Sequence, residues 1–172
     1  VLGLTPSTGD ISVHWPDPKQ TQQAGQIGYV PQKAMFEASL PLTVMDFVLL
    51  NQTRVPLFWR RKSKQTQQAL AQLERVGMAA RCDRRMGQLS GGEQQRVQLA
   101  RVLTQVWDPV VDGTARWLFL DEPVSALDIG HQLQVMQIAR DFADAGGGVV
   151  AVMHDLNLTA MFADTVALIS DG

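Results

Sequence analysis

The sequence predicts an α/β fold in which helices cover a parallel β-sheet, with a block of helices inserted between two parts of that sheet. Short apolar runs typical of buried strands alternate with longer segments whose apolar residues recur at helical spacing. Strands that alternate with helices indicate a parallel sheet with right-handed crossovers. Three of the apolar runs end in polar side chains, and ligands of open α/β sheets bind at the carboxyl ends of strands.

Composition narrows the class of protein. The 172 residues are 45% hydrophobic and 19% charged, as is ordinary for a globular domain with a real core. A formal net charge of −2 gives no overall attraction to nucleic acid or to anionic lipid. Cys82 is the single cysteine in the 172 residues, so they cannot form an internal disulfide. No apolar run approaches the roughly 18 residues that suggest a membrane span, so a membrane role needs a partner.

The first part of the sheet lies in residues 1–33. Residues 11–15 alternate as a half-buried strand, and residues 27–30 form a second strand that Pro31 ends. Gln32 therefore sits at the end of a strand, where its carbonyl oxygen can reach a metal ion and its water. The alternative is an ordinary glutamine in a loop.

The helical block spans residues 34–105. Residues 34–50 are predicted to be helical, the basic run 59–64 reads as a solvated loop, and residues 65–76 form an amphipathic helix that ends at Gly77. A long buried helix follows the sequence Leu89–Arg96, whose serine and glycines let the backbone approach an anion. Unpaired N–H groups and the macrodipole make such a helix start a phosphate-binding site. The alternative is an ordinary capping box, in which Ser90 caps the helix and the Glu93 side chain bonds back to the backbone of Ser90.

The second part of the sheet lies in residues 106–172. One apolar run ends in Asp121 and Glu122, and the run 149–153 ends in His154. Between them residues 130–145 are predicted to form a helix that ends at a run of three glycines. A further helix is expected over 157–162 and a last strand over 165–170.

These motifs, in this order and spacing, resemble those of the nucleotide-binding subunit of ABC transporters over nearly the whole chain. Leu89–Arg96 is similar to the signature motif, Trp117–Pro123 to the Walker B strand, Ser125–Asp128 to the D-loop, His154 to the switch histidine and Gln32 to the Q-loop. The resemblance implies a P-loop NTPase (RecA-like) core, residues 1–33 and 106–172, with an inserted α-helical subdomain, residues 34–105.

The resemblance also implies an ATPase that uses ATP and Mg²⁺. Asp121 is then expected to hold Mg²⁺ through its water shell, with Gln32 completing that shell. Glu122 is expected to act as general base toward the attacking water, and His154 to bond the γ-phosphate and hold that water in line. The alternative for the two acids is a structural cap of the turn before Pro123.

In the family two subunits pack head to tail, and each signature motif closes on the ATP of the other subunit. By this resemblance Ser90, Gly91, Gly92 and Gln94 contact the partner's ATP, and Asp128 lies at the seam. The other partners implied are transmembrane permease subunits and, indirectly, a periplasmic or extracellular substrate-binding protein, with no nucleic acid. By the same resemblance, exposed members of the set Met35, Phe36, Leu40 and Phe47 are candidates for the groove that receives the permease. The expected location is the cytoplasmic face of the bacterial inner membrane.

The sequence lacks one motif that the family requires. No G-x-x-x-x-G-K-[ST] phosphate loop occurs in the 172 residues, and the sequence begins without methionine. We therefore expect an N-terminally truncated core that is inactive alone.

The cargo and two competing functions stay open. The connection 107–114 and the motif regions 89–103 and 153–158 are similar to haem-importing and other metal-chelate ATPases, whereas the Q-loop region is closer to zinc or manganese importers. The alternatives are a soluble, non-transport ABC ATPase and a catalytically incompetent fragment.

Overall fold

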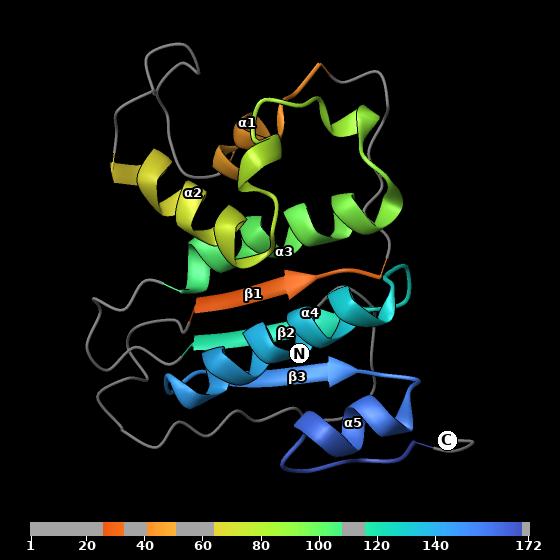
Figure 1. Ribbon diagram of the computed structural model, residues 1–172. Coiled ribbons are helices and arrows are strands. Elements are labelled where there is room, and N and C mark those ends of the chain that lie inside the picture. The colour runs from red at the N-terminus through yellow and green to blue at the C-terminus, as the bar shows by residue number, and fades with distance from the viewer. Residues whose placement is uncertain (1–25, 33–40, 51–63, 108–115, 170–172) are drawn as a thin grey trace, which may run out of the picture.

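The computed structural model describes residues 26–32, 41–50, 64–107 and 116–169 (Figure 1). In chain order its elements are β1 (Gln26–Val30), α1 (Val44–Leu49), α2 (Lys64–Arg75), the 3₁₀ turns η3 (Ala79–Arg81) and η4 (Met86–Gln88), α3 (Gly91–Val106), β2 (Arg116–Asp121), α4 (Ile129–Asp144), β3 (Gly148–Val152) and α5 (Leu156–Phe162). The predicted strand 11–15, most of the basic run 59–64 and the permease-groove residues Met35, Phe36 and Leu40 lie outside the described residues.

The three described strands form a parallel sheet in the order β1-β2-β3, as the sequence predicts. Val30 pairs with Leu120, and Asp121 pairs with Val152, so the carboxyl ends of all three strands reach the same edge. Parallel strands need crossover connections, and here helices supply them. The residues that follow the strands are therefore brought together at this edge.

Helices α1, α2 and α3 gather beyond β1, and α4 lies across the β3 side of the sheet (Figure 1). Helix α3 is central to the core because its buried face packs on β1 and on α2. A Cβ atom at Gly28 would lie only 2.5 Å from Cγ1 of Val102, so the absence of a side chain in β1 lets α3 approach closely. The largest fully buried side chains are Phe142, Leu73, Met78, Leu103, Leu118 and Leu120.

Both glycines predicted to end helices adopt the left-handed conformation. Gly77 has φ +68° two residues beyond the end of α2, and Gly146 has φ +87° two residues beyond the end of α4. This conformation is free of steric cost only in glycine, which explains why the helices end there. The predictions for α2 and α4 are confirmed to within a residue or so at each end.

The prediction of a helix over 34–50 is confirmed over Val44–Leu49 and is wrong over the described residues 41–43. Helix α1 begins only at Val44, because Thr43 is extended and forms an antiparallel bridge with Arg85. The Thr43 hydroxyl accepts a hydrogen bond from the Asp46 amide, and the Asp46 carboxylate accepts one from Thr43 in return. This capping box fixes the start of the helix.

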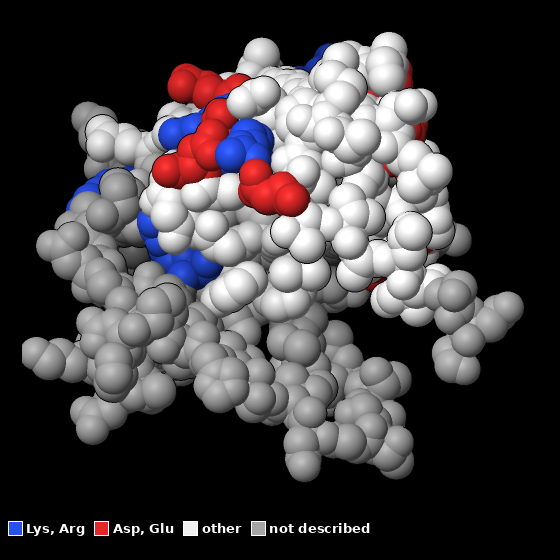
Figure 2. Space-filling view, turned by 90° about the horizontal axis from the view of Figure 1, so that it is seen from below, with Lys and Arg blue, Asp and Glu red and all other residues white. Residues whose placement is uncertain are grey.

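The predicted last strand is also wrong over residues 165–169, which pair with no described strand. Leu168 and Ile169 are 85% and 95% exposed. Extended residues form a strand only when a neighbouring backbone completes the ladder, and β3 pairs only with β2 within the described sheet. Figure 2 views the molecule from below Figure 1, the side where α5 lies, and shows a mostly uncharged described surface beside a small group of acidic and basic side chains.

Candidate functional site

Three predicted site residues from three different strand ends meet at the carboxyl edge of the sheet. The side-chain amide of Gln32 donates a hydrogen bond to Oε2 of Glu122 at 2.6 Å, and Nε2 of His154 lies 2.6 Å from Oε1 of the same carboxylate. Both carboxylate oxygens are thus engaged. Glu122 is 19% exposed in its side chain and His154 is 76% exposed, so the cluster opens to solvent on the histidine side.

Local structure fixes each of the three side chains. Pro31 ends β1 immediately before Gln32, and Asp155, which caps α5 through the amides of Asn157 and Leu158, immediately follows His154. Glu122 has φ +47°, a conformation that is uncommon outside glycine. Its amide donates to the Val152 carbonyl at 3.1 Å, so β3 holds the strained residue in place.

The contacts of Glu122 favour its charged form. The hydrogen bond from His154, and then the one from Gln32, lower the pKa of the Glu122 carboxyl below its ordinary value, and partial burial opposes this only in part. The carboxylate is therefore ionised at neutral pH. Each carboxylate oxygen accepts one of these hydrogen bonds and keeps a second acceptor position, through which Glu122 can take the proton of a bound water.

Asp121 lies beside this cluster and accepts a hydrogen bond from the Tyr29 hydroxyl, with 3.2 Å between that oxygen and Oδ2. Burial, and then the contact with Asp121, raises the pKa of Tyr29, so its hydroxyl stays a donor. The oxygens of Asp121 and Gln32 are the hard donors that Mg²⁺ prefers. No group of three or more His, Cys, Asp or Glu side chains that could hold a metal occurs in the described part of the chain. Because Asp121 and Gln32 supply two such oxygens, they fit Mg²⁺ that keeps its remaining ligands as water.

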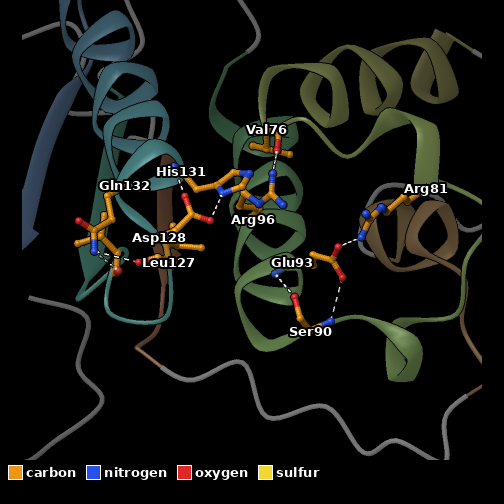
Figure 3. A network of polar contacts seen from close by, with 10 residues as sticks. Val76, Arg81, Ser90, Glu93, Arg96, Leu127, Asp128, His131 and Gln132 are labelled. Atoms are coloured by element: carbon orange, nitrogen blue, oxygen red, sulfur yellow. Dashed lines mark hydrogen bonds and ion pairs between the residues drawn. The ribbon is translucent and has the colours of Figure 1, made fainter.

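The start of α3 carries both features that the sequence left as alternatives. The Ser90 hydroxyl accepts a hydrogen bond from the Glu93 amide at 3.3 Å, and the Glu93 carboxylate accepts one from the Ser90 amide at 2.9 Å. This is the capping box of an ordinary helix start. Arg81 pairs with the other oxygen of Glu93 (Figure 3). The Ser90 hydroxyl proton stays free of these contacts, so the cap leaves a donor for a ligand.

The two glycines of the motif differ in their surroundings. Nothing lies within 4 Å of a Cβ atom built on Gly91, so the backbone there is open. A Cβ atom on Gly92 would lie 2.9 Å from the Ala126 carbonyl oxygen and 3.0 Å from Cδ2 of Leu127. Gly91 therefore leaves room for an anion, whereas Gly92 lets α3 pack against the segment that follows β2.

The remaining two predicted site residues hold local structure in this chain. The side-chain amide of Gln94 donates to the carbonyls of Met86 and Leu89, at 3.2 and 3.3 Å, and so secures the turn before the helix. Asp128 caps α4 by accepting from the His131 amide at 3.1 Å, and its other oxygen lies 2.6 Å from Nδ1 of His131 (Figure 3). Among the described residues, no hydrogen bond joins Gln94 or Asp128 to the Glu122 cluster.

Besides His131, which pairs with Asp128, sequence reasoning missed three residues that contact the predicted motifs. These are Tyr29 beside Asp121, Arg81 beside Glu93, and Gln95, whose amide donates to the Glu122 carbonyl at 3.1 Å. Gln95 could have been found, because it occupies the helical register of Leu99, Val102, Leu103 and Val106, and a polar residue on that apolar face requires a partner. The sequence contained no comparable signal for Arg81.

Comparison with known proteins identifies the class to which this fold and site belong. The ABC transporter family profile matches residues 2–125. A solved dimeric structure of MJ0796, a bacterial ABC transporter cassette, superimposes with a TM-score of 0.60 and 28% identity, over 80% of this chain and 56% of that one. A post-hydrolysis dimer of the same cassette bound to ADP and Pi gives a TM-score of 0.57 at 28% identity, over 78% and 54% of the two chains.

The chain belongs to the ABC transporter family, as its motifs predict. It is 52% identical over 171 residues to the hemin import ATP-binding protein HmuV of Jannaschia sp. (strain CCS1), covering 98% of this chain and 61% of that protein. The protein of that name from Ruegeria sp. (strain TM1040) is 49% identical over 170 residues, covering 97% of this chain and 63% of its own. The chain thus spans about six tenths of the length of these relatives.

Proposed function

We propose that the protein is the ATP-hydrolysing subunit of an ABC importer that energises uptake of haem, an iron chelate or a metal ion. The observation that carries this is the Glu122 carboxylate, held at 2.6 Å by both Gln32 and His154 where three parallel strands end. The relatives named for hemin import support haem as the first choice of cargo. An ATPase subunit does not touch the cargo, so the site itself does not distinguish these substrates.

In the proposed reaction Glu122 accepts the proton of the attacking water. Its low pKa keeps it ionised, and His154 is exposed enough to turn from Glu122 toward a phosphate oxygen. Asp121 and Gln32 would hold Mg²⁺, which neutralises charge on the phosphates of ATP. The Tyr29 hydroxyl keeps the Asp121 carboxylate oriented toward this edge of the sheet.

The second half of the proposed site comes from another copy of the chain. Ser90, Gly91 and Gly92 would meet the ATP of the partner subunit in a head-to-tail homodimer, and Asp128 would lie at the seam. Two features support this role: the open backbone at Gly91 and the Ser90 hydroxyl proton, which the capping box does not use. Gln94 supports it indirectly, since it fixes the turn that presents Ser90.

Partners and location follow from the importer function. The helical subdomain, residues 34–105, would receive the transmembrane permease subunits, while residues 1–33 and 106–172 form the RecA-like core. None of the described helices is both long and apolar enough to traverse a bilayer. In the proposed importer the permease would hold this subunit at the cytoplasmic face of the inner membrane, with a substrate-binding protein acting on the far side.

The test replaces Glu122 by glutamine in the whole protein that contains this sequence. Glu122→Gln keeps shape and hydrogen-bonding reach but removes the proton acceptor, so turnover should fall to background while ATP binding persists. A closed, ATP-bound dimer should then accumulate. Phosphate release, nucleotide affinity and ATP-dependent dimerisation by size-exclusion chromatography measure the three effects.

Two further variants separate the parts of the site. Asp121→Asn should weaken Mg²⁺ affinity and with it productive nucleotide binding. Ser90→Arg should block dimer closure without weakening ATP binding to the single subunit. Near-normal turnover in Glu122→Gln, or no ATP-dependent dimer, would require withdrawal of the base assignment and of the shared site.

A further inference from the structure

Gln95 is a buried polar residue that contacts the site from the helix of the signature motif. It is only 6% exposed, and its amide donates to the Glu122 carbonyl with 3.1 Å between nitrogen and oxygen. Its own Oε1 has no hydrogen-bond partner among the described residues. Burying an amide is costly unless it is hydrogen-bonded, and here only its donor side has a partner, the backbone of Glu122.

The peptide that Gln95 holds is the strained one. Glu122 has φ +47°, and its carbonyl also accepts from the amide and the hydroxyl of Ser125, at 3.3 and 3.2 Å. Both Ser125 donors belong to the same tight turn as Glu122 itself. The donor on Gln95 comes from outside that turn, so α3 supplies an independent restraint on the orientation of this peptide.

Helix α3 touches the same segment a second time, one turn earlier. The close approach of Gly92 to Ala126 and Leu127 supports the far end of residues 122–127, while Gln95 supports the near end. The start of α3, with Ser90 and Gly91, is therefore tied to the segment that carries Glu122 in the same subunit. A shift of α3 displaces the peptide of Glu122 through both contacts.

We propose that Gln95 is a positioning residue that fixes the Glu122 peptide and thereby couples ligand contact at Ser90–Gly91 to the placement of Glu122 in the same subunit. Without this donor the Glu122 carbonyl is held only by Ser125, a residue of its own turn, so the turn can shift as a unit and move the carboxylate away from Gln32 and His154. The chemical step suffers, whereas the groups that bind nucleotide keep their places. This role rests on the ATPase function proposed above.

The test is Gln95→Met in the whole protein, with Gln98→Met as the matched control on the same helix. Methionine has a similar length and removes the unpartnered Oε1, so the fold should tolerate it. Gln98 is half-buried and lies one turn from the contact. We expect kcat per nucleotide-binding site to fall about tenfold in Gln95→Met with KM for ATP changed less than about twofold. Gln98→Met should match the wild type in both.

Counting sites by bound nucleotide in calorimetry removes any loss through misfolding. A second variant, Gln95→Glu, keeps the length but places an acceptor against the Glu122 carbonyl, and it should show the same loss of kcat with ATP-dependent dimerisation retained. Unchanged kcat per site in both variants would overturn the role of Gln95. If Glu122→Gln is inactive while both Gln95 variants turn over normally, only this inference fails. If Glu122→Gln itself turns over, the proposed function fails with it.

Discussion

The two glycines at the start of α3 should respond in opposite ways to the same substitution. A methyl group on Gly92 would lie 2.9 Å from the Ala126 carbonyl oxygen, closer than a real Cβ contact, and backbone cannot move aside as a flexible side chain does. A methyl group on Gly91 meets nothing within 4 Å. Gly92→Ala should therefore destabilise the fold, and Gly91→Ala should not.

The expected magnitudes follow from two opposing effects. Overpacking of a close contact costs about 1–3 kcal/mol. Alanine in place of glycine in a helix stabilises it by about 0.5–1 kcal/mol. The net loss for Gly92→Ala is therefore about 0–2.5 kcal/mol, whereas Gly91→Ala should gain about 0.5–1 kcal/mol. The two variants share the helix term, so Gly92→Ala should be less stable than Gly91→Ala by the overpacking cost of about 1–3 kcal/mol. For a protein of this size 1 kcal/mol corresponds to a shift of about 2–4 °C in the melting temperature.

Thermal unfolding of the whole protein, followed by circular dichroism without nucleotide, measures both shifts and needs no assumption about catalysis. The wild type and the two variants are compared in one buffer. Equal melting temperatures for Gly92→Ala and Gly91→Ala would show that α3 does not pack on residues 126–127 as described. A loss at Gly91 as large as that at Gly92 would show that the space around Gly91 is not open.

The remaining predictions concern pH and cargo. His154 and Gln32 lower the pKa of Glu122 in the folded protein. The Glu122 carboxylate therefore stabilises the fold at pH values above the ordinary pKa of a glutamate. This stabilisation is lost as the pH falls through the lowered pKa. Melting temperatures between about pH 6 and pH 3 should fall more steeply in the wild type than in Glu122→Gln, and parallel curves would contradict this linkage. A strain that lacks the protein should grow poorly on haem, or else on siderophores or under zinc or manganese limitation. Normal growth under all of these conditions would count against the importer function.

Sequence patterns predicted the parallel sheet and the long helices because each of these is determined by short-range periodicity. Residues 26–30, 116–121 and 148–152 are apolar runs bounded by breakers, and α3 and α4 have caps and stops that are visible in the sequence. The start of α1 is set by two features at Thr43, the capping box with Asp46, which is visible in the sequence, and the bridge to Arg85, which is not. The expected last strand failed because pairing needs a neighbour that no local pattern reveals.

The candidate site was predictable in its members more than in its contacts. The meeting of Gln32, Glu122 and His154 follows from the topology, because the carboxyl ends of adjacent parallel strands share one edge. The sequence did not predict that Glu122 would adopt a left-handed backbone or that both its oxygens would be engaged. Likewise the sequence predicted Ser90–Gly92 as one ligand-binding unit. In the structure Gly91 faces open space, whereas Gly92 packs against Ala126 and Leu127.

The two surfaces of α3 explain how one helix can serve two sites. Around its start, Ser90 and Gly91 face open space, where a ligand of the partner subunit can approach. On its other side Gly92 and Gln95 contact the segment that carries Glu122 in the same chain. Substitutions at the open positions should therefore affect dimer closure, whereas those at the packed positions should affect fold stability or turnover within one subunit. Since both sets lie within two helical turns, the proposed coupling between nucleotide at Ser90–Gly91 and Glu122 would run through α3 and its contacts with residues 122–127.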